Sequence, residues 1–309
     1  MIRPRTNGHR KGCWVKVDVG IVTAAGALQA RLPFQRLIDT DGREKPALRI
    51  LAEEVFSAGI KTLYVVIGQG LSAECQEAVG RDFANRIVFV EQQGTPGYSA
   101  AVLQAAELAG PQPFLHLVGD HLSISSLPNR RCAQQVVECA RAENCAVSAV
   151  QATREGLLPY YGAVGGQRVP GSQLVEIECV FEKPTPTQAE QRLQVSGVRS
   201  GQYLCFFGMH VLLPSVVTLL KELLAADPAN SPQFSQVLHQ LAQRERYLAM
   251  EVQGTRHDLG IRYGTWITQL ALGLAGVDRE DVLSHLVEQL ASSALLAGPV
   301  AARRSHSGE

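Results

Sequence analysis

Short apolar runs alternate with longer amphipathic segments along most of this sequence. Thr62–Ile67 is rich in apolar residues, and Phe114–Asp120 has four apolar residues among its first five before it stops at a Gly-Asp pair. Between such runs, residues such as Leu48, Leu51 and Val55 recur at the spacing of one helix face. Alternation of buried strands with amphipathic helices predicts an α/β protein.

The predicted elements follow one another at short intervals. We expect strands at 15–23, 62–67, 86–90, 114–120, 146–151, 160–166, 174–182, 198–209 and 248–252. We expect helices after Lys45-Pro46 and at 72–79, 99–109, 131–143, 213–224, 234–244, 263–275 and 278–296. An irregular stretch is expected at 27–41 and a loop at 257–260. This order predicts a doubly wound, Rossmann-like fold with a mostly parallel, mixed sheet and a C-terminal helical extension.

The sequence shows no repeat and no clean linker, so we expect one main domain. It would run from 15 to 276, behind a flexible basic arm at 1–14. A C-terminal helix would cover 277–300, and a tail would cover 301–309. The apolar side of that helix would pack on its own domain or form a subunit contact.

Composition narrows the class of protein. The 309 residues have a formal net charge of zero, which argues against a broad nucleic-acid-binding face. None of the seven cysteines forms a Cys-x-x-Cys pair, which favours free thiols in a reducing compartment. We see no secretory signal and no apolar run long enough to cross a bilayer. The expectation is therefore a cytoplasmic protein with no membrane or nucleic-acid partner.

Two acidic residues are candidate metal ligands. Asp120 ends an apolar run, and strand ends line the ligand crevice of an open α/β sheet. A carboxylate there is suited to hold Mg²⁺ against phosphates. Asp258 ends a second such region, within His257-Asp258-Leu259-Gly260. Ordinary aspartate turns are the alternative at both positions.

Three further stretches carry candidate binding chemistry. Small residues at Ala24-Ala25-Gly26 would let a nucleotide approach the backbone. Gln93-Gly94 precedes a helix, whose N-terminus attracts anions, and the glutamine amide suits a nucleobase edge. Glu182-Lys183 ends a strand and would hold sugar hydroxyls and a sugar phosphate. The alternatives are plain turns and an exposed charge pair.

Taken together, these stretches match one family in order and spacing. They are Thr23-Ala24-Ala25-Gly26, Lys45-Pro46, Ala58-Gly59-Ile60, Gln93-Gly94 with Gly97, Gly119-Asp120, Tyr161-Gly162, Phe181-Glu182-Lys183-Pro184, Ser200-Gly201-Gln202-Tyr203, and His257-Asp258 with Gly260, Tyr263 and Gly264. The sequence resembles the bacterial UTP–glucose-1-phosphate uridylyltransferases (UDP-glucose pyrophosphorylases), within the sugar nucleotidylyltransferases. The resemblance extends over about 19–276.

The resemblance implies a reaction and a set of roles. Glucose 1-phosphate, or a related sugar 1-phosphate, would attack the α-phosphorus of UTP and release pyrophosphate. The implied nucleotide-binding residues are Ala24, Ala25, Gly26, Gln93, Gly94 and Asp120, and the implied Mg²⁺ ligands are Asp120 and Asp258. The implied sugar-binding residues are Gly162, Glu182 and Lys183, with Lys183 contacting the sugar phosphate. The resemblance also implies a homo-oligomer. The identity of the sugar and the choice between uridine and thymidine stay open.

The first loop departs from the family pattern. The family has Gly-x-Gly-Thr-Arg followed by Pro-Lys, whereas residues 26–36 lack the second glycine, the threonine and the lysine. Arg31, Arg36 and Lys45 are candidate replacements for the cations that face the triphosphate, with Arg31 and Arg36 as catalytic candidates beside Lys183. A solvated basic loop is the alternative. Two functions follow: an active uridylyltransferase, or a catalytically weakened relative that binds nucleotide or nucleotide sugar as a regulatory or assembly partner.

Overall fold

A computed structural model describes most of the chain. The described residues are 15–26, 31–94, 97–227 and 231–296. The predicted arm, the predicted tail and the last residues of the predicted C-terminal helix segment lie outside them.

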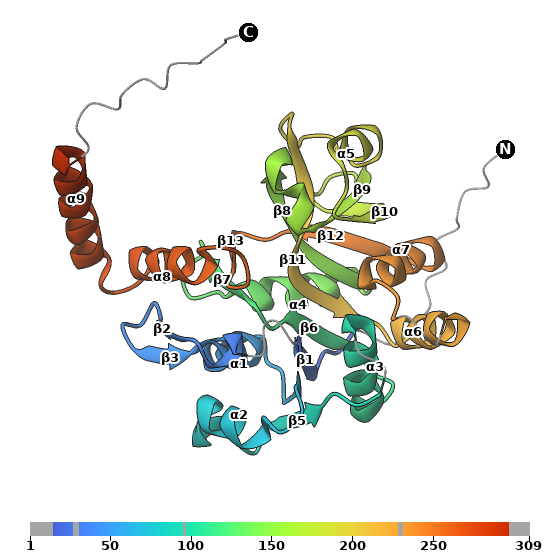
Figure 1. Cartoon of the computed structure of the whole chain (residues 1–309). Coiled ribbons are helices and arrows are strands. Elements are labelled where there is room, and N and C mark those ends of the chain that lie inside the picture. Colours follow the sequence, from blue (N-terminus) through green and yellow to red (C-terminus); the bar gives the residue numbers. More distant parts are fainter. Residues whose placement is uncertain (1–14, 27–30, 95–96, 228–230, 297–309) are drawn as a thin grey trace, which may run out of the picture.

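Within the described residues, a nine-stranded mixed sheet forms the centre of the molecule (Figure 1). All but two of its strands, β10 and β11, run in one direction. This confirms the predicted α/β class with a mostly parallel, mixed sheet. Across the sheet the order is β5 (Ile87–Glu91), β4 (Thr62–Ile67), β1 (Val19–Ala24), β6 (Phe114–Val118), β11 (Gln202–Leu212), β8 (Ala146–Arg154), β12 (Tyr247–Glu251), β10 (Val175–Glu182) and β9 (Gly162–Arg168).

Helices cover both faces of this sheet. One buried apolar cluster contains residues of α1 (Ala47–Ser57), α2 (Ser72–Val79) and α4 (Cys132–Glu143). A second contains residues of α3 (Tyr98–Ala109), α6 (Ser215–Ala226) and α7 (Phe234–Arg244). Because both faces are covered, β1 and β6 are buried on both sides, which explains why most of their residues are apolar. The short helix α5 (Pro186–Arg192) belongs to the lobe of β9 and β10 (Figure 1).

Two small ribbons stand outside the main sheet. β7 (His121–Ser125) pairs antiparallel with β13 (Gly254–Asp258), and β2 (Arg36–Ile38) pairs with β3 (Glu44–Pro46). The sequence predicted a loop at His257-Asp258 and an irregular stretch around Arg36. Both predictions were wrong, because these strands have only three or five residues, too few to show a clear apolar period, and they are recognised only by their pairing with another strand. Apolar periodicity does not detect such ribbons.

The C-terminal helices continue the chain beyond β13. α8 (Gly264–Ala275) contacts α9 (Arg279–Leu296), which stands away from the body (Figure 1). Leu283, Val287 and Leu290 of α9 are exposed. The expected helix therefore forms, and the homo-oligomer stays a prediction. None of the helices in the described part of the chain is both long and apolar enough to cross a bilayer.

Candidate functional site

The C-terminal ends of β1 and β6 bring two predicted stretches together. The strands pair in parallel with Thr23 opposite Val118, so Ala24–Gly26 and Asp120 emerge at the same edge. The Gly119 N–H donates to the Thr23 carbonyl over 2.9 Å. A Cβ at Gly119 would lie 2.5 Å from that carbonyl oxygen, so glycine permits the close approach of the two chains.

A cavity of about 410 Å³ opens at this edge, and we call it the Gly26 cavity. Tyr98 and Ala101 of its wall lie in the first turn of α3, and Gly97, directly before the helix, has a φ of 129° that favours glycine. The helix N-terminus therefore faces the cavity and favours negative charge there. The wall consists of Thr23, Ala24, Ala25, Gly26, Leu32, Pro33, Gln92, Gly97, Tyr98, Ala101, Val118, Gly119 and Asp120.

The described wall of the Gly26 cavity contains Gln92 rather than the adjacent Gln93. Gln93 and Gly94, the predicted base-reading residues, are absent from the described wall of the Gly26 cavity, whereas Gln92 is part of it. The Gln92 amide donates to the Gly97 carbonyl over 2.9 Å. Gln92 and Gln93 both follow β5, and only Gln92 contributes to the described wall. The base contact expected of Gln93 stays a prediction, and Gln92 is a second candidate for it.

A second cavity of about 360 Å³ lies beside β9 and β10, and we call it the Glu182 cavity. It brings Gly162, Glu182 and Lys183 together, as the resemblance implied. The antiparallel register sets Glu182 opposite Gly162. A Cβ on Gly162 would lie 3.2 Å from Glu182 Oε2 and 3.0 Å from the Phe206 ring, so glycine leaves room beside the carboxylate.

The backbone of Lys183 has an unusual conformation. Its φ is 45°, in the left-handed region that non-glycine residues rarely adopt, and its N–H donates to the Tyr161 carbonyl over 3.2 Å. Pro184 follows directly. Such backbone strain gathers at functional sites, where the surrounding structure holds it in place. This conformation supports the Glu182-Lys183 turn as a candidate functional position.

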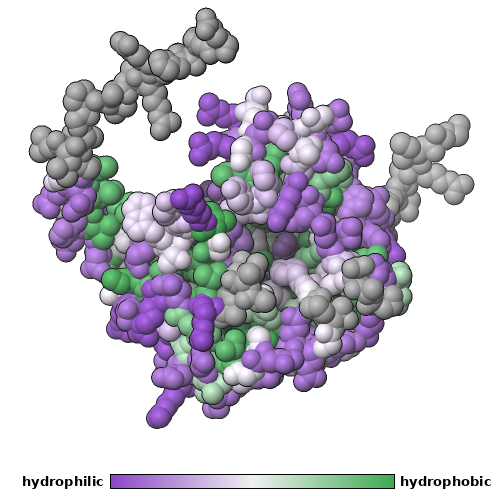
Figure 2. All heavy atoms as spheres, viewed as in Figure 1, coloured by the Kyte–Doolittle hydropathy of each residue, from purple (hydrophilic) through white to green (hydrophobic). Residues whose placement is uncertain are grey.

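The two cavities meet. Tyr98 and Val118 belong to both walls, while Asp120 lines the Gly26 cavity and the adjacent His121 lines the Glu182 cavity. In the space-filling view the surface is hollowed at the centre, beneath the lobe of β9, β10 and α5 (Figure 2). Two ligands bound side by side would thus face each other across Asp120 and His121.

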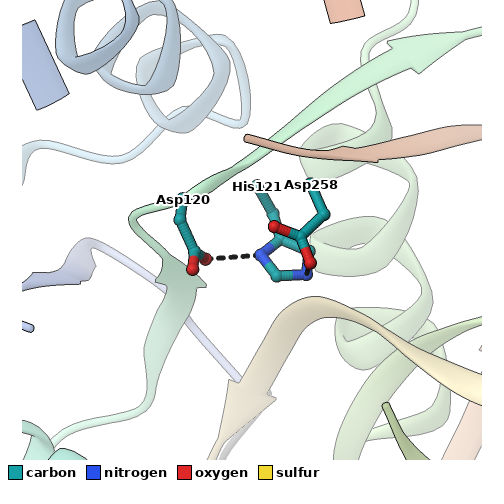
Figure 3. A group of neighbouring side chains, drawn as sticks. All are labelled: Asp120, His121 and Asp258. Carbon is teal, nitrogen blue, oxygen red and sulfur yellow. Dashed lines mark hydrogen bonds and ion pairs between the residues drawn. The ribbon is translucent and has the colours of Figure 1, made fainter. Parts of the chain in front are cut away.

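Asp258 completes a cluster at this junction. The pairing of β7 with β13 sets Asp258 opposite His121. The His121 Nδ1–H donates to Asp120 Oδ1 over 2.5 Å, and His121 Nε2 lies 3.8 Å from Asp258 Oδ2 (Figure 3). Each residue offers one ligand atom, and these atoms lie within 4.8 Å of one another. Two carboxylates and an imidazole at this spacing fit a divalent cation.

A layer of buried polar side chains packs against the walls of the two cavities where they meet. Thr23 Oγ1 and Tyr98 Oη each lie 3.2 Å from His116 Nε2. His116 stacks on His210, whose Nδ1 contacts Ser148 Oγ at 2.5 Å. Burial lowers the pKa of His116 well below its ordinary value and that of His210 to about 3. Both imidazoles are therefore neutral near pH 7.

The predicted replacement cations lie elsewhere. Arg31 pairs with Glu74 at 2.9 Å and Arg36 with Glu44 at 2.8 Å, both on the surface. Lys45 is buried among three carboxylates, Asp39, Asp41 and Glu53, with Nζ–O distances of 2.7–2.8 Å. The structure does not bring Arg31, Arg36 or Lys45 to the described wall of either cavity. Residues 27–30 of the loop lie outside the described residues.

Sequence reasoning missed His121, Tyr98 and Arg256. His121 follows Asp120 directly, so a signal for it was present in the pair. Arg256 stacks on the Tyr161 ring at 3.5 Å and donates to the Phe206 carbonyl. Burial lowers the pKa of Arg256. Arg256 holds the ring of Tyr161, which is part of the Glu182 cavity wall.

Comparison with known proteins yields one consistent family. The sequence profile described as "Nucleotidyl transferase" matches residues 36–266. A curated UTP–glucose-1-phosphate uridylyltransferase 2 of Streptococcus pyogenes is 24% identical over 302 residues, covering 89% of this chain and 96% of that protein.

Two solved structures share the fold. One is a UDP-glucose pyrophosphorylase complexed with UDP-glucose, with a TM-score of 0.66 and 20% identity, covering 83% of this chain and 98% of that one. The other is a UTP-bound enzyme from Acinetobacter baumannii, also with a TM-score of 0.66 and 20% identity, covering 89% and 100%. These likenesses establish the shared architecture.

Proposed function

The chain belongs to the nucleotidyl transferase family, and we propose that it transfers a uridylyl group from UTP to glucose 1-phosphate or a related sugar 1-phosphate. The products would be a UDP-sugar and pyrophosphate. One observation carries the proposal: the Gly26 and Glu182 cavities share walls and meet at Asp120 and His121, opposite Asp258. That arrangement suits two phosphorylated substrates that react with each other.

The Gly26 cavity would hold the nucleotide. Its small residues Ala24, Ala25 and Gly26 allow a close approach of the ligand, and the N-terminus of α3 favours phosphate charge. Gln92 would contact the base edge in place of Gln93, because only Gln92 belongs to the described cavity wall. The curated relatives that act on UTP support uridine as the base.

The Glu182 cavity would hold the sugar 1-phosphate. Glu182 would accept hydrogen bonds from sugar hydroxyls, with Gly162 leaving room for the ring. Lys183 would bind the phosphate and bring its oxygen toward the junction. The UDP-glucose complex of a structural neighbour supports a hexose as the sugar.

Catalysis would rest on positioning and charge. An oxygen of the sugar phosphate attacks the α-phosphorus of UTP, the new P–O bond forms, and the bond to the β-phosphate breaks with its electron pair leaving on pyrophosphate. The attacking phosphate is already ionised, so no general base is needed. A divalent cation, held by Asp120 and Asp258, would neutralise the charge on the phosphates when bound.

A catalytically weakened, ligand-binding relative is the second candidate. The observation that favours it is the pairing of Arg31 with Glu74 and Arg36 with Glu44, because neither arginine lines the described part of the Gly26 cavity. Loss of cationic stabilisation would lower turnover while leaving binding in place.

Pyrophosphate release separates the two candidates. Purified protein would be mixed with UTP, glucose 1-phosphate and Mg²⁺, with a metal-free sample as control. Robust, metal-dependent release supports the transferase, and a panel of sugar 1-phosphates and nucleotides then defines the substrates. Binding of UDP-glucose without release favours the weakened relative. Absence of both release and binding would overturn both candidates.

A further inference from the structure

The ring of His121 bridges the two acidic residues at the junction. Asp120 Oδ1 accepts a hydrogen bond from Nδ1 over 2.5 Å, which places the opposite nitrogen, Nε2, on the side of Asp258 (Figure 3). Nε2 lies 3.8 Å from Asp258 Oδ2. Two donors that bind one ion at about 2.1 Å each lie about 3–4 Å apart, so this spacing suits a shared cation.

We propose that His121 Nε2 is a ligand of the cation at this centre, beside Asp258, and that it shifts the preference of the centre from Mg²⁺ toward Mn²⁺ and Co²⁺. This inference rests on the metal centre of the proposed function. In this arrangement Asp120 orients the imidazole, in the manner of carboxylate–histidine–metal arrangements, in addition to its role toward the cation.

The donor set is the reason for the preference. Mg²⁺ favours oxygen ligands and keeps its waters, so an imidazole nitrogen adds little to its binding. Mn²⁺ and Co²⁺ accept carboxylate and imidazole together, and the Irving–Williams order strengthens the nitrogen contribution from Mn²⁺ to Co²⁺. A centre built from Asp120, Asp258 and His121 therefore differs in metal choice from one built from carboxylates alone.

His257 provides a matched control. It neighbours Asp258, yet its Nε2 contacts Thr255 Oγ1 at 3.0 Å, and it does not belong to the metal-binding group found among the described residues. Replacing His257 removes an imidazole of the same sequence neighbourhood, while the proposed ligands remain in place.

The test is spectroscopic. Mn²⁺ would be added to the full chain without substrate, and pulsed electron paramagnetic resonance would record the ¹⁴N modulation of a coordinated imidazole. We expect the modulation in the wild type and in His257→Asn, and its loss in His121→Asn. Competition titration should show the preference for Mn²⁺ over Mg²⁺ falling about tenfold in His121→Asn. Asp120→Asn should weaken Mn²⁺ binding about 10–100-fold.

The outcomes distinguish this inference from the proposed function. Modulation that persists in His121→Asn, or a wild-type spectrum without nitrogen coupling, overturns the role of His121 even if pyrophosphate is released with Mg²⁺. Nitrogen coupling that depends on His121 supports the role of His121 as a metal ligand. If the same protein releases no pyrophosphate, the proposed uridylyltransferase function is overturned while the ligand role stands. An unchanged metal preference in His121→Asn contradicts the second half of the proposal.

Discussion

The Gly26 and Glu182 cavities resemble the family pattern to different degrees. In the Glu182 cavity, Gly162 and Glu182 lie on two antiparallel strands whose register places them opposite each other, and Lys183 directly follows β10. In the Gly26 cavity, the small backbone residues lie where expected, but Arg31 and Arg36 pair with other partners. Strand register sets Gly162 beside Glu182, whereas Arg31 and Arg36 pair with surface carboxylates outside the described wall of the Gly26 cavity.

Two lysines show the same difference. Lys45 is buried among three carboxylates and serves the hairpin of β2 and β3. Lys183 lines the Glu182 cavity and makes no ion pair within the described part of the chain. A positive charge is available to a ligand phosphate only in the second case. The position of a cation in the fold, not its presence in the sequence, decides its use.

The largest expected effect is at the junction between the cavities. Asp258→Asn should lower turnover about 1000-fold, because the cation would lose a charged ligand and with it several kcal/mol of transition-state stabilisation. Pyrophosphate release measures it, and circular dichroism checks the fold. Asp281→Asn, on the exposed face of α9, is the matched control and should behave as wild type. Near-normal turnover in Asp258→Asn would contradict the shared metal centre.

The Glu182 cavity is tested next. Lys183→Ala should lower kcat/KM for the sugar 1-phosphate about 100-fold, because the phosphate loses its cationic partner. The KM for UTP should change little, since Lys183 does not line the Gly26 cavity. Lys221→Ala, which removes a surface pair with Glu107, is the control. An equal loss of kcat/KM for the sugar 1-phosphate and for UTP would contradict the assignment of one substrate to each cavity.

The buried layer beneath both cavities gives a pH-dependent effect. His116 and His210 are neutral when folded because burial depresses the pKa of each below the unfolded value of about 6.5. Below pH 6.5 the unfolded chain binds protons that the folded chain excludes. The free energy of unfolding should therefore keep its full value above about pH 6.5. On acidification below that pH it should fall by about 1.4 kcal/mol per pH unit for each of the two histidines.

Urea unfolding between pH 7 and pH 5 measures this slope. His210→Gln should flatten it by about the contribution of one histidine, whatever its effect on stability at pH 7. His285→Gln, on the exposed surface of α9, is the control for replacing a histidine outside the buried layer. A slope that is unchanged in His210→Gln would mean that the layer does not exclude protons.

The smallest effect is expected in the altered loop. Arg31→Ala should change turnover by no more than about twofold, because Arg31 forms an exposed ion pair with Glu74. Such a surface pair contributes little free energy. Steady-state kinetics with UTP and sugar 1-phosphate measures it, with Arg36→Ala in parallel. A tenfold or greater loss of turnover in Arg31→Ala would indicate that this arginine contacts the triphosphate of UTP. It would contradict the difference between the two cavities.

The sequence by itself determined the layers and the strand-end residues. Apolar periodicity reports the burial of each residue, so the parallel core, Asp120 and the Glu182-Lys183 turn were all predictable. The resemblance implied that Gly162 and Glu182 belong to the same sugar-binding site. The register of β9 and β10 sets these two residues opposite each other.

Tertiary structure alone decided the rest. Asp258 reaches His121 only through the pairing of β13 with β7, two strands without a clear apolar pattern. The described wall of the Gly26 cavity contains Gln92 and not Gln93, and Arg31 pairs with Glu74 outside that wall. These outcomes depend on contacts between distant segments, whose free energies no local pattern contains, because strand pairing and charge pairing are settled by the whole fold.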